Sequence, residues 1–306
     1  MARYVFGRLL QAAVVLWLLT VIVFAISRIS GSPVDLLVPI GAGPETRERL
    51  VEQYGLDRPL PVQYATFLGD AVQGAFGRSI RFQAPALELV LDRLPATLKL
   101  AGAALLLAII VGIPLGMLGA LAHGRRGDYA VTSLLTLGQA TPSFWLGILL
   151  ILYVGVKLRW LPIAGDQGLE SLIMPAIALS IVPLVSIARL TRSSMIGVLR
   201  HDYVRTARAK GLRRSRVLFR HVAPNGLIPV VTIVGISLAE LISGAVITEQ
   251  IFSWPGIGRL AVESINARDF PVVQAVTLVA AAGVVLASLI VDLVYLMLDP
   301  RIRDSL

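Results

Sequence analysis

The chain has 306 residues, of which 56% are hydrophobic and only 15% charged, and its mean hydropathy is +0.78. An average soluble domain is about 45–50% apolar and about 25% charged, so this composition excludes an ordinary soluble protein and indicates an integral membrane protein. The chain contains no cysteine and no Gly-Lys pair, which excludes disulfides, thiolate chemistry and a Walker A phosphate loop. We predict no catalytic residue and no metal site. The net charge of +9 indicates basic loops beside a membrane rather than binding of nucleic acid.

Six apolar segments are close to or above the length of about 20 residues that a membrane-spanning helix needs. They are Leu9–Ser27, Leu100–Ala122, Ala130–Val156, Leu172–Ala188, Leu227–Thr248 and Val272–Leu298. The fourth segment is the shortest and contains two prolines. The first is longer than the core of a signal peptide and is not followed by an A-x-A cleavage pattern, so we expect a retained helix. The predicted fold class is therefore an all-α integral membrane protein with six transmembrane helices.

The distribution of basic residues predicts the orientation. The termini and the even-numbered loops carry sixteen of them, namely Arg3, Arg8, Arg125, Arg126, ten between Arg189 and Arg220, Arg301 and Arg303. The short odd-numbered loops carry four, namely Lys157, Arg159, Arg259 and Arg268. Because cytoplasmic loops are enriched in Lys and Arg, we expect both termini in the cytoplasm.

The first outer loop contains helical patterns at Glu45–Tyr54 and Gln63–Ala75, so we expect short helices packed on the outer membrane face rather than a solvated linker. The resulting plan has four parts. They are an N-terminal transmembrane helix at 1–30, an outer loop at 31–97, a five-helix core at 98–298 and a tail at 299–306. The core includes a cytoplasmic loop at 189–226.

That cytoplasmic loop is rich in information, because it holds ten basic residues and a single acid, Asp202. We predict one short helix ending near Lys210, where Gly211 takes the left-handed conformation that stops a helix. A second short helix is expected over about Ser215–Val222. The small residues Ala207, Ala209 and Gly211 would let another protein approach the backbone. The alternative is an ordinary cytoplasmic loop whose basic residues only reflect the positive-inside rule.

The same loop carries a family resemblance. ABC importer permeases contain a motif written as EAA, three residues, Gly, nine residues and I-x-L-P, and Ala207, Gly211 and Pro224 fall at its third, seventh and last positions. The stretch Asp202–Gly211 reads DYVRTARAKG and resembles the form found in peptide and nickel importer permeases. Further segments agree in order along the chain: YGLDRPL at 54–60, GAFGRS at 74–79, FSWPGIG at 252–258 and RDFPVVQ at 268–274. The short N-terminus and long outer loop resemble the B-type subunit.

This resemblance implies a type I ABC importer permease fold and a bacterial inner-membrane protein that passes di- or oligopeptides. Nickel or glutathione is the alternative substrate within the same class. It implies as partners a second, C-type permease, two ATP-binding subunits that hold ATP and Mg, and an extracytoplasmic substrate-binding protein. The chain itself would bind no cofactor, and besides these proteins it would contact membrane lipid and no nucleic acid. The residues assigned to coupling with the ATPases are Arg205, Thr206, Ala207, Arg208, Ala209, Lys210, Gly211 and Pro224.

Two acids interrupt the predicted spans. Glu240 would cost about 2.5–3.5 kcal/mol near the centre of a helix in lipid, so it must face protein or water, close to Ser237, Ser243 and Gly244. It is either a polar lining of the pathway, near a substrate amine, or a structural hydrogen-bonded carboxyl. Asp292 is expected to meet a loop arginine or the partner subunit.

Two glycine-containing segments complete the candidate sites. Trp254, Pro255, Gly256 and Gly258 would fold back at the outer face between the last two helices, as an outer gate or as a rigid turn. Gly112, Gly116 and Gly119 have the spacing that allows close helix packing, and we expect them to pack within the subunit.

Two other classes of protein compete with an importer permease. An intramembrane protease would need a His or two matched acids within the spans, and the spans contain no His. A proton-coupled secondary carrier would use Glu240 as its proton relay. Transport driven by ATP with partner subunits, or by a pH gradient, separates the permease from the carrier.

Overall fold

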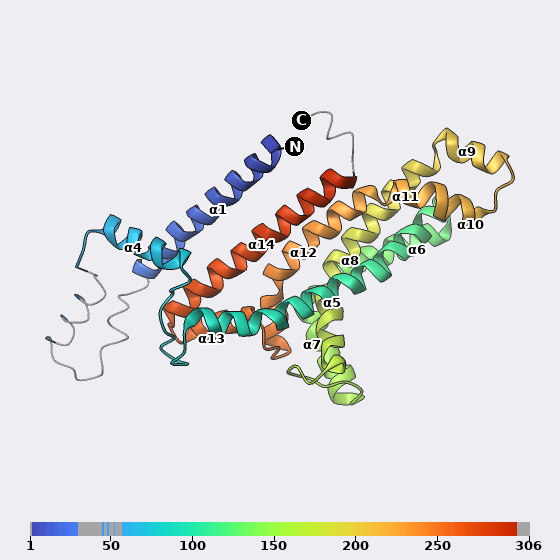
Figure 1. Cartoon of the computed structure of the whole chain (residues 1–306). Helices are drawn as coiled ribbons and strands as arrows, with labels where there is room; N and C mark the ends of the chain where they lie inside the picture. The colour runs from blue at the N-terminus through green and yellow to red at the C-terminus, as the bar shows by residue number, and fades with distance from the viewer. Residues whose placement is uncertain (1, 30–44, 46–47, 49–51, 53–56, 299–306) are drawn as a thin grey trace. The chain divides into compact units, whose positions relative to one another are not determined.

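The computed structural model of the chain describes residues 2–29, 45, 48, 52 and 57–298 (Figure 1). Regular structure in these ranges is helical, apart from an isolated bridge between Arg78 and Pro85. In chain order the helices are α1 (Ala2–Ile29), α4 (Leu60–Val72), α5 (Ala86–Leu121), α6 (Arg126–Ala140), α7 (Ser143–Leu150), the π-helix η1 (Ile151–Lys157), α8 (Leu169–Leu199), α9 (Asp202–Ala209), α10 (Arg214–Val217), the π-helix η2 (Leu218–Val222), α11 (Ala223–Gly226), α12 (Ile228–Ile251), α13 (Ile257–Asn266) and α14 (Phe270–Leu298).

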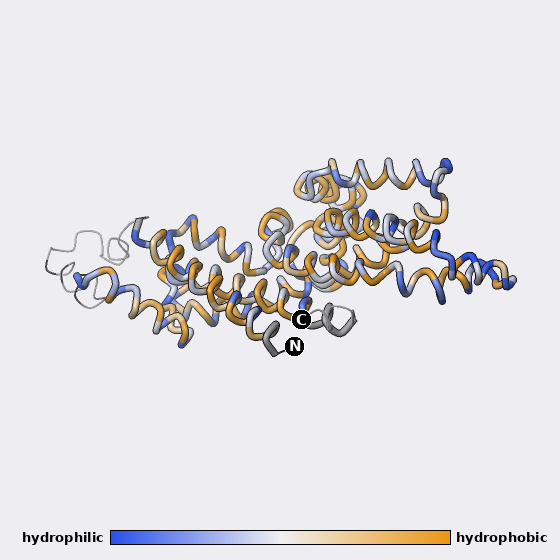
Figure 2. Tube along the Cα trace, turned by 90° about the horizontal axis from the view of Figure 1, so that it is seen from above, coloured by the Kyte–Doolittle hydropathy of each residue, from blue (hydrophilic) through white to orange (hydrophobic). Residues whose placement is uncertain are grey.

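Five of the described helices are long and apolar enough to cross a membrane: α1, α5, α8, α12 and α14. The third predicted span corresponds to α6 followed by α7 and η1, a pair bent by 92° that counts as a sixth span if it is taken as one. Figure 2 shows apolar residues running along the long helices, while hydrophilic residues gather at the tip formed by α9 and α10. The all-α membrane fold predicted from the sequence is confirmed.

The bend between α6 and α7 has a local cause. Proline pushes the residue before it out of the helical region and cannot donate the next backbone hydrogen bond. Thr141, which precedes Pro142, is extended at ψ 115°, and Pro142 is extended at ψ 134° before α7 begins. The backbone N–H and hydroxyl of Thr141 both bond to the carbonyl of Leu137, at 3.1 and 2.8 Å. Pro142 lies within the third predicted span, and in the structure the chain bends sharply at this residue.

The fourth predicted span is longer than the apolar segment suggested. α8 begins three residues earlier, at Leu169, and continues to Leu199, with Pro175 and Pro183 inside it. The eleven residues from 189 to 199, which were expected to open the loop, are therefore part of this helix. Arg192 can lie on it because its charge is paired with an acid of α6, as described below.

The chain folds into two compact units. The first contains residues 1–95 and 256–285. Here α1 contacts α4, and the hydroxyls of Thr20 and Tyr64 lie 2.8 Å apart. A second cluster is formed by the start of α5, α13 and the start of α14, with these buried residues: Ala86, Val90, Ile257, Leu260, Val272, Ala275 and Val276. α4 confirms the second helix predicted in the outer loop, whereas the first, Glu45–Tyr54, lies almost wholly outside the described residues.

The second unit, residues 96–255 and 286–306, is built around α8. This helix contacts α6, α7, α11 and α12, and α5 approaches it along the predicted glycines. A Cβ added to Gly112 would lie 2.9 Å from the carbonyl oxygen of Leu184, and one added to Gly116 would collide with the backbone of Ala188. These glycines therefore allow close packing of α5 on α8 within the subunit, as the spacing predicted.

Candidate functional site

The helix α9 forms within the predicted motif and ends as predicted. Asp202 lies in its first turn and Arg208 in its last, where each charge is favourable to the helix dipole. Gly211 has φ +74°. Its N–H bonds to the carbonyl of Arg208 at 3.0 Å, and the N–H of Leu212 bonds to that of Ala207 at 3.4 Å. These two bonds form a Schellman motif, in which a left-handed residue closes the helix.

One side of α9 is apolar and packs on this chain's own helices. Val204 and Ala207 are buried against Ala120 at the end of α5 and Met195 near the end of α8, together with Val217 of α10 and Val222 of η2. The Ala207 side chain is only 6% exposed. Ala207 was assigned from the sequence to the approach of another protein, but its side chain contacts this chain instead. Its small size lets α9 lie close to α5 and α8.

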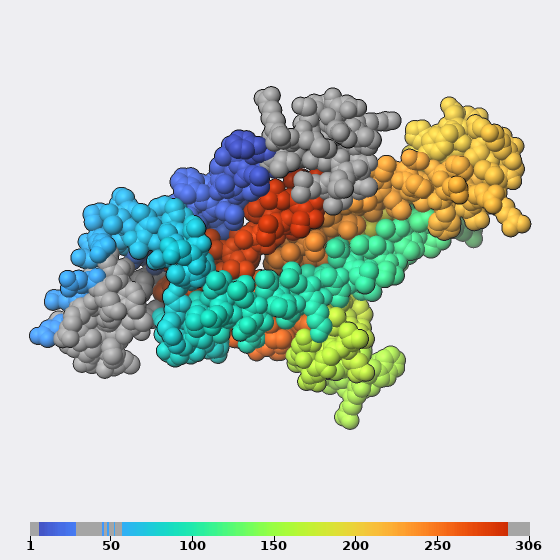
Figure 3. Space-filling view, in the orientation of Figure 1, coloured from blue at the N-terminus to red at the C-terminus, as the bar shows by residue number. Residues whose placement is uncertain are grey.

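The other side of α9 is polar and exposed, and we call it the outer face of α9. It consists of Tyr203, Arg205, Thr206, Arg208, Ala209, Lys210 and Gly211. Figure 3 shows the yellow segment that contains α9 projecting at the tip of the second unit. A Cβ added to Gly211 would meet no atom within 4 Å. The space beside Gly211 is thus open in this chain, as close approach by a second protein requires.

The second short helix is also present, in two parts. α10 and η2 cover residues 214–222, close to the predicted Ser215–Val222, and α11 follows with Pro224 in its first turn. Pro224 is exposed. The hydroxyl of Tyr203 donates to the carbonyl of His221 at 3.4 Å, so η2 and α9 are joined by a polar contact as well as by the apolar cluster. The loop is therefore built from short helices that pack on one another.

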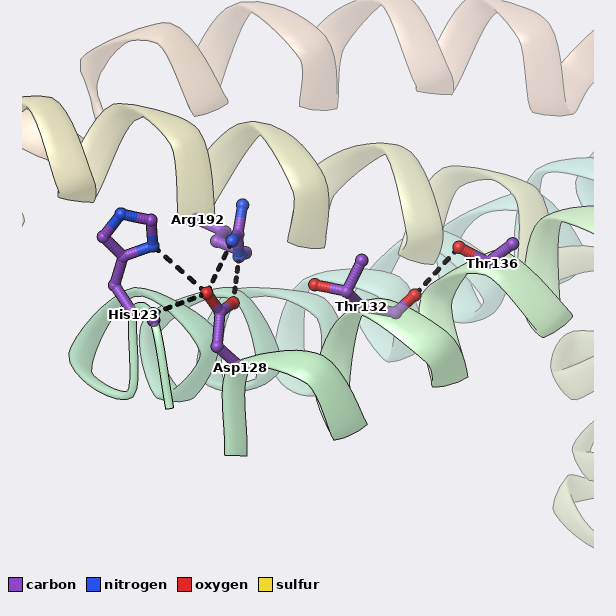
Figure 4. A network of polar contacts seen from close by, with 6 residues as sticks. His123, Asp128, Thr132, Thr136 and Arg192 are labelled. Atoms are coloured by element: carbon purple, nitrogen blue, oxygen red, sulfur yellow. Dashed lines mark hydrogen bonds and ion pairs between the residues drawn. The ribbon is translucent and has the colours of Figure 1, made fainter. Parts of the chain in front are cut away.

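A buried ion pair lies close to this element and was not predicted (Figure 4). Asp128, in the first turn of α6, is 6% exposed. Arg192 of α8 donates to it from Nε to Oδ1 at 2.6 Å and from Nη2 to Oδ2 at 2.8 Å. The backbone N–H of Gly124 and Nδ1 of His123 lie 3.0 and 3.1 Å from Oδ2. The bidentate pair ties α6 to α8 about two helical turns before α8 ends.

The same side of α6 carries two threonines on successive turns. Thr136 donates to the carbonyl of Thr132 at 2.9 Å (Figure 4). Its hydroxyl also accepts from Nη2 of Arg189 at 3.4 Å. Two arginines of α8, Arg189 and Arg192, therefore both bond to α6. From the sequence both were counted only as positive charges of a loop.

The segment after α12 is a buried turn. Ser253 has φ +48°, and Trp254 is 0% exposed, with its Nε1 donating to the carbonyl of Ala96 at 2.9 Å. The Trp254 N–H also bonds to the carbonyl of Glu249 at 2.8 Å. The sequence left two roles open for this segment, an outer gate and a rigid turn. These contacts support the rigid turn for Trp254 and Pro255. Gly256 precedes α13, and Gly258 is buried within it.

Besides Asp128, two further buried acids were not predicted from the sequence. Glu249, on the last turn of α12, is 0% exposed and accepts from the Thr97 hydroxyl at 2.6 Å. Asp269 is also 0% exposed and accepts from the Ser79 hydroxyl at 2.5 Å. Asp269 lies in a quoted family segment, so a signal was present. Glu249 directly follows an apolar segment, and the sequence gives no sign that it is buried.

The two predicted membrane acids lie in different surroundings. Glu240 lies in the middle of α12 and is exposed in this chain, so its role as a pathway lining or as a structural hydrogen-bonded carboxyl stays a prediction. Asp292 is half-buried on α14, and its expected contact with a loop arginine or partner stays a prediction. Among the described residues, no group of three or more His, Asp or Glu side chains is arranged to hold a metal ion.

The chain matches a known protein family over most of its length. The family described as "Binding-protein-dependent transport system inner membrane component" matches residues 112–304, and its N-terminal companion matches residues 1–101. The oligopeptide transport system permease protein AppB of Bacillus subtilis is 41% identical over 315 residues, which cover 99% of this chain and all of that protein. The di/tripeptide transport system permease protein DppB of Pseudomonas aeruginosa is 39% identical and covered to 94%, as is this chain.

A solved structure agrees on the fold. The permease fold of the inward-facing MetNI methionine ABC transporter superposes with a TM-score of 0.61 at 16% identity, covering 70% of this chain and 98% of that one. At this identity the likeness concerns the fold alone. It is the fold of a type I ABC importer permease.

Proposed function

Because the chain belongs to the family of binding-protein-dependent transport system inner membrane components, we propose that it is the B-type permease subunit of an ATP-driven importer of di- or oligopeptides. The names of its relatives, which are oligopeptide, di/tripeptide and dipeptide permeases, support peptides over nickel or glutathione. The chain would supply half of the translocation pathway, and a C-type permease the other half.

The remaining partners follow from this role. Two ATP-binding subunits would hold ATP and Mg and carry out hydrolysis, so this chain has no enzymatic activity of its own. An extracytoplasmic binding protein would select and deliver the peptide. The chain would lie in the bacterial cytoplasmic membrane with both termini in the cytoplasm.

The observation that carries the proposal is the two-sided character of α9. Its outer face is basic and open, which suits docking on an ATP-binding subunit, and its inner face is fixed to α5 and α8 by Val204 and Ala207. A movement of the docked ATPase would therefore move the ends of α5 and α8. The pair between Asp128 and Arg192 would pass that movement to α6. Rigid packing at each step makes this transmission possible.

The function is tested by uptake of labelled trialanine into proteoliposomes. We expect ATP-dependent uptake when the chain is reconstituted with its co-encoded permease, ATPases and binding protein, and none from the chain alone. A pH gradient without ATP should drive no uptake. Uptake by the single chain, or uptake driven by the pH gradient, would overturn the proposal in favour of a secondary carrier.

The orientation is tested separately by labelling in intact cells. The native chain has no cysteine, so single cysteines can be introduced at the exposed positions Gln73 and Ser215. We expect a membrane-impermeant maleimide to label Gln73→Cys and not Ser215→Cys until the cells are opened. The reverse pattern would place the termini outside.

A further inference from the structure

The exposed side of α12 combines a charge with small residues. Ile236, Glu240, Ser243, Gly244 and Ile247 are all exposed and fall on one side of the helix at intervals of three and four residues. The opposite side, which includes Leu241, Ile242, Ala245, Thr248 and Glu249, is buried. We call these five exposed residues the Glu240 face.

This face lies deep in the membrane. Glu240 is the thirteenth of the 24 residues of α12, about 17 Å from either end at 1.5 Å per residue. The hydrocarbon core is about 30 Å thick, so the carboxyl group lies near its centre. An ionisable side chain at that depth faces protein or a water-filled path rather than lipid. The described residues of the second unit do not cover it.

We infer that the Glu240 carboxylate binds the positively charged amino terminus of a peptide as it passes through the membrane. This site rests on the proposed function and adds a specificity determinant to it. The amino terminus is the cation that all unblocked peptides share, whatever their side chains, and a carboxylate is its charge complement. One fixed negative charge could therefore serve substrates as varied as those for which the relatives are named.

The neighbours of Glu240 suit a moving ligand. Ser243 and Gly244 lie one turn further along the same face, and a Cβ added to Gly244 would meet no atom within 4 Å. The Ser243 hydroxyl is bonded to the carbonyl of Ala239 at 3.2 Å. Space beside the carboxylate is thus open, and no described basic side chain of this chain forms an ion pair with it.

The test is uptake by the complete transporter, with excess binding protein, in proteoliposomes. Glu240→Gln keeps the shape and removes the charge, Glu240→Asp keeps the charge, and Ser133→Ala is a control at an exposed serine of α6. We expect Glu240→Gln to lower the maximal rate of trialanine uptake about tenfold, while Glu240→Asp retains about half and Ser133→Ala is unchanged. Subunits should co-purify normally in all three variants.

A second substrate identifies the amine. At concentrations that saturate the binding protein, N-acetyl-trialanine should be taken up more slowly than trialanine by the wild type and at an equal rate by Glu240→Gln. Unchanged trialanine uptake in Glu240→Gln would overturn the inference. So would loss of the second permease from purified Glu240→Gln, which would show that the carboxylate pairs with that subunit. If wild-type transporter shows no ATP-driven uptake, the proposed function fails instead.

Discussion

Two motif segments, one before and one after α12 in the chain, are held in opposite ways. Before it, α9 is fixed along one apolar side, while its polar side is exposed. After it, the turn at Phe252–Trp254 is buried and is held by two hydrogen bonds. Trp254 donates to the carbonyl of Ala96, and the carbonyl of Phe252 accepts from the N–H of Gly165 at 2.9 Å. Both segments carry family motifs. The contrast teaches that a motif can mark a surface kept open for a partner or a joint that the chain needs for its own rigidity.

Removal of the indole at the buried turn should have the largest effect on stability. Trp254→Ala deletes a fully buried side chain and its bond to the Ala96 carbonyl, and such truncations cost about 3–5 kcal/mol. We expect loss of most folded protein in detergent, measured by fluorescence-detected size exclusion after heating. Trp254→Phe should lose less, because most of the apolar area remains. A wild-type melting profile for Trp254→Ala would mean that the turn is a mobile gate.

Loss of the ion pair between α6 and α8 should have the second largest effect on stability. Asp128→Asn removes the charge that Arg192 contacts at 2.6 and 2.8 Å, and the expected loss is about 2–3 kcal/mol. A double-mutant cycle with Arg192→Gln checks whether the two residues act together: the double variant should lose clearly less than the sum of the single losses. Strict additivity would show that α6 and α8 are joined by other contacts.

The buried hydroxyl near the turn should have a smaller effect. Thr97→Val keeps the shape of the side chain but leaves the Oε1 atom of Glu249 without that donor, at an expected cost of about 1–2 kcal/mol. Ser186→Ala is the matched control, because the Ser186 hydroxyl bonds to a carbonyl of its own helix at an exposed position. Equal melting shifts for the two variants would contradict a special role for the buried bond.

An exposed residue of α9 should not affect folding at all. Arg205 and Asp202 lie 3.4 Å apart with side chains 78% and 94% exposed, and such a surface pair contributes little to stability. Arg205→Ala should therefore melt like the wild type. If the outer face docks on an ATPase, retention of the ATPase during purification should fall by up to about fivefold, the range of one exposed ion pair. Unchanged retention would remove Arg205 from the interface.

Local signals were enough to predict α9, its end at Gly211 and most of the apolar spans. The orientation of α9 was harder. Its small residues occur on both sides, and only contact with α5 and α8 decides that Ala207 faces inward while Ala209 stays exposed. Val204, three residues before Ala207, was a signal for that side and was available in the sequence.

The other misses depend on tertiary structure. Asp128 and Arg192 are 64 residues apart in the chain, and only the packing of α6 on α8 brings them together. Thr97 and Glu249 are separated by 152 residues. Pro142 lies inside the third predicted span. A proline in a membrane helix is compatible with a mild kink or with a sharp corner, so the 92° bend could not be deduced.

The central claim, that α9 docks an ATP-binding subunit, is tested most directly by comparing Gly211→Ala with Gly211→Arg. Both variants suffer the strain of a side chain at φ +74°, about 1–2 kcal/mol, and neither side chain collides at its Cβ with this chain, where the space is open. Only the arginine should collide with a docked protein. We predict that pull-down from detergent retains the ATPase subunits with Gly211→Ala and loses them with Gly211→Arg, while both insert normally in the membrane. Equal retention with the two variants would contradict docking at α9.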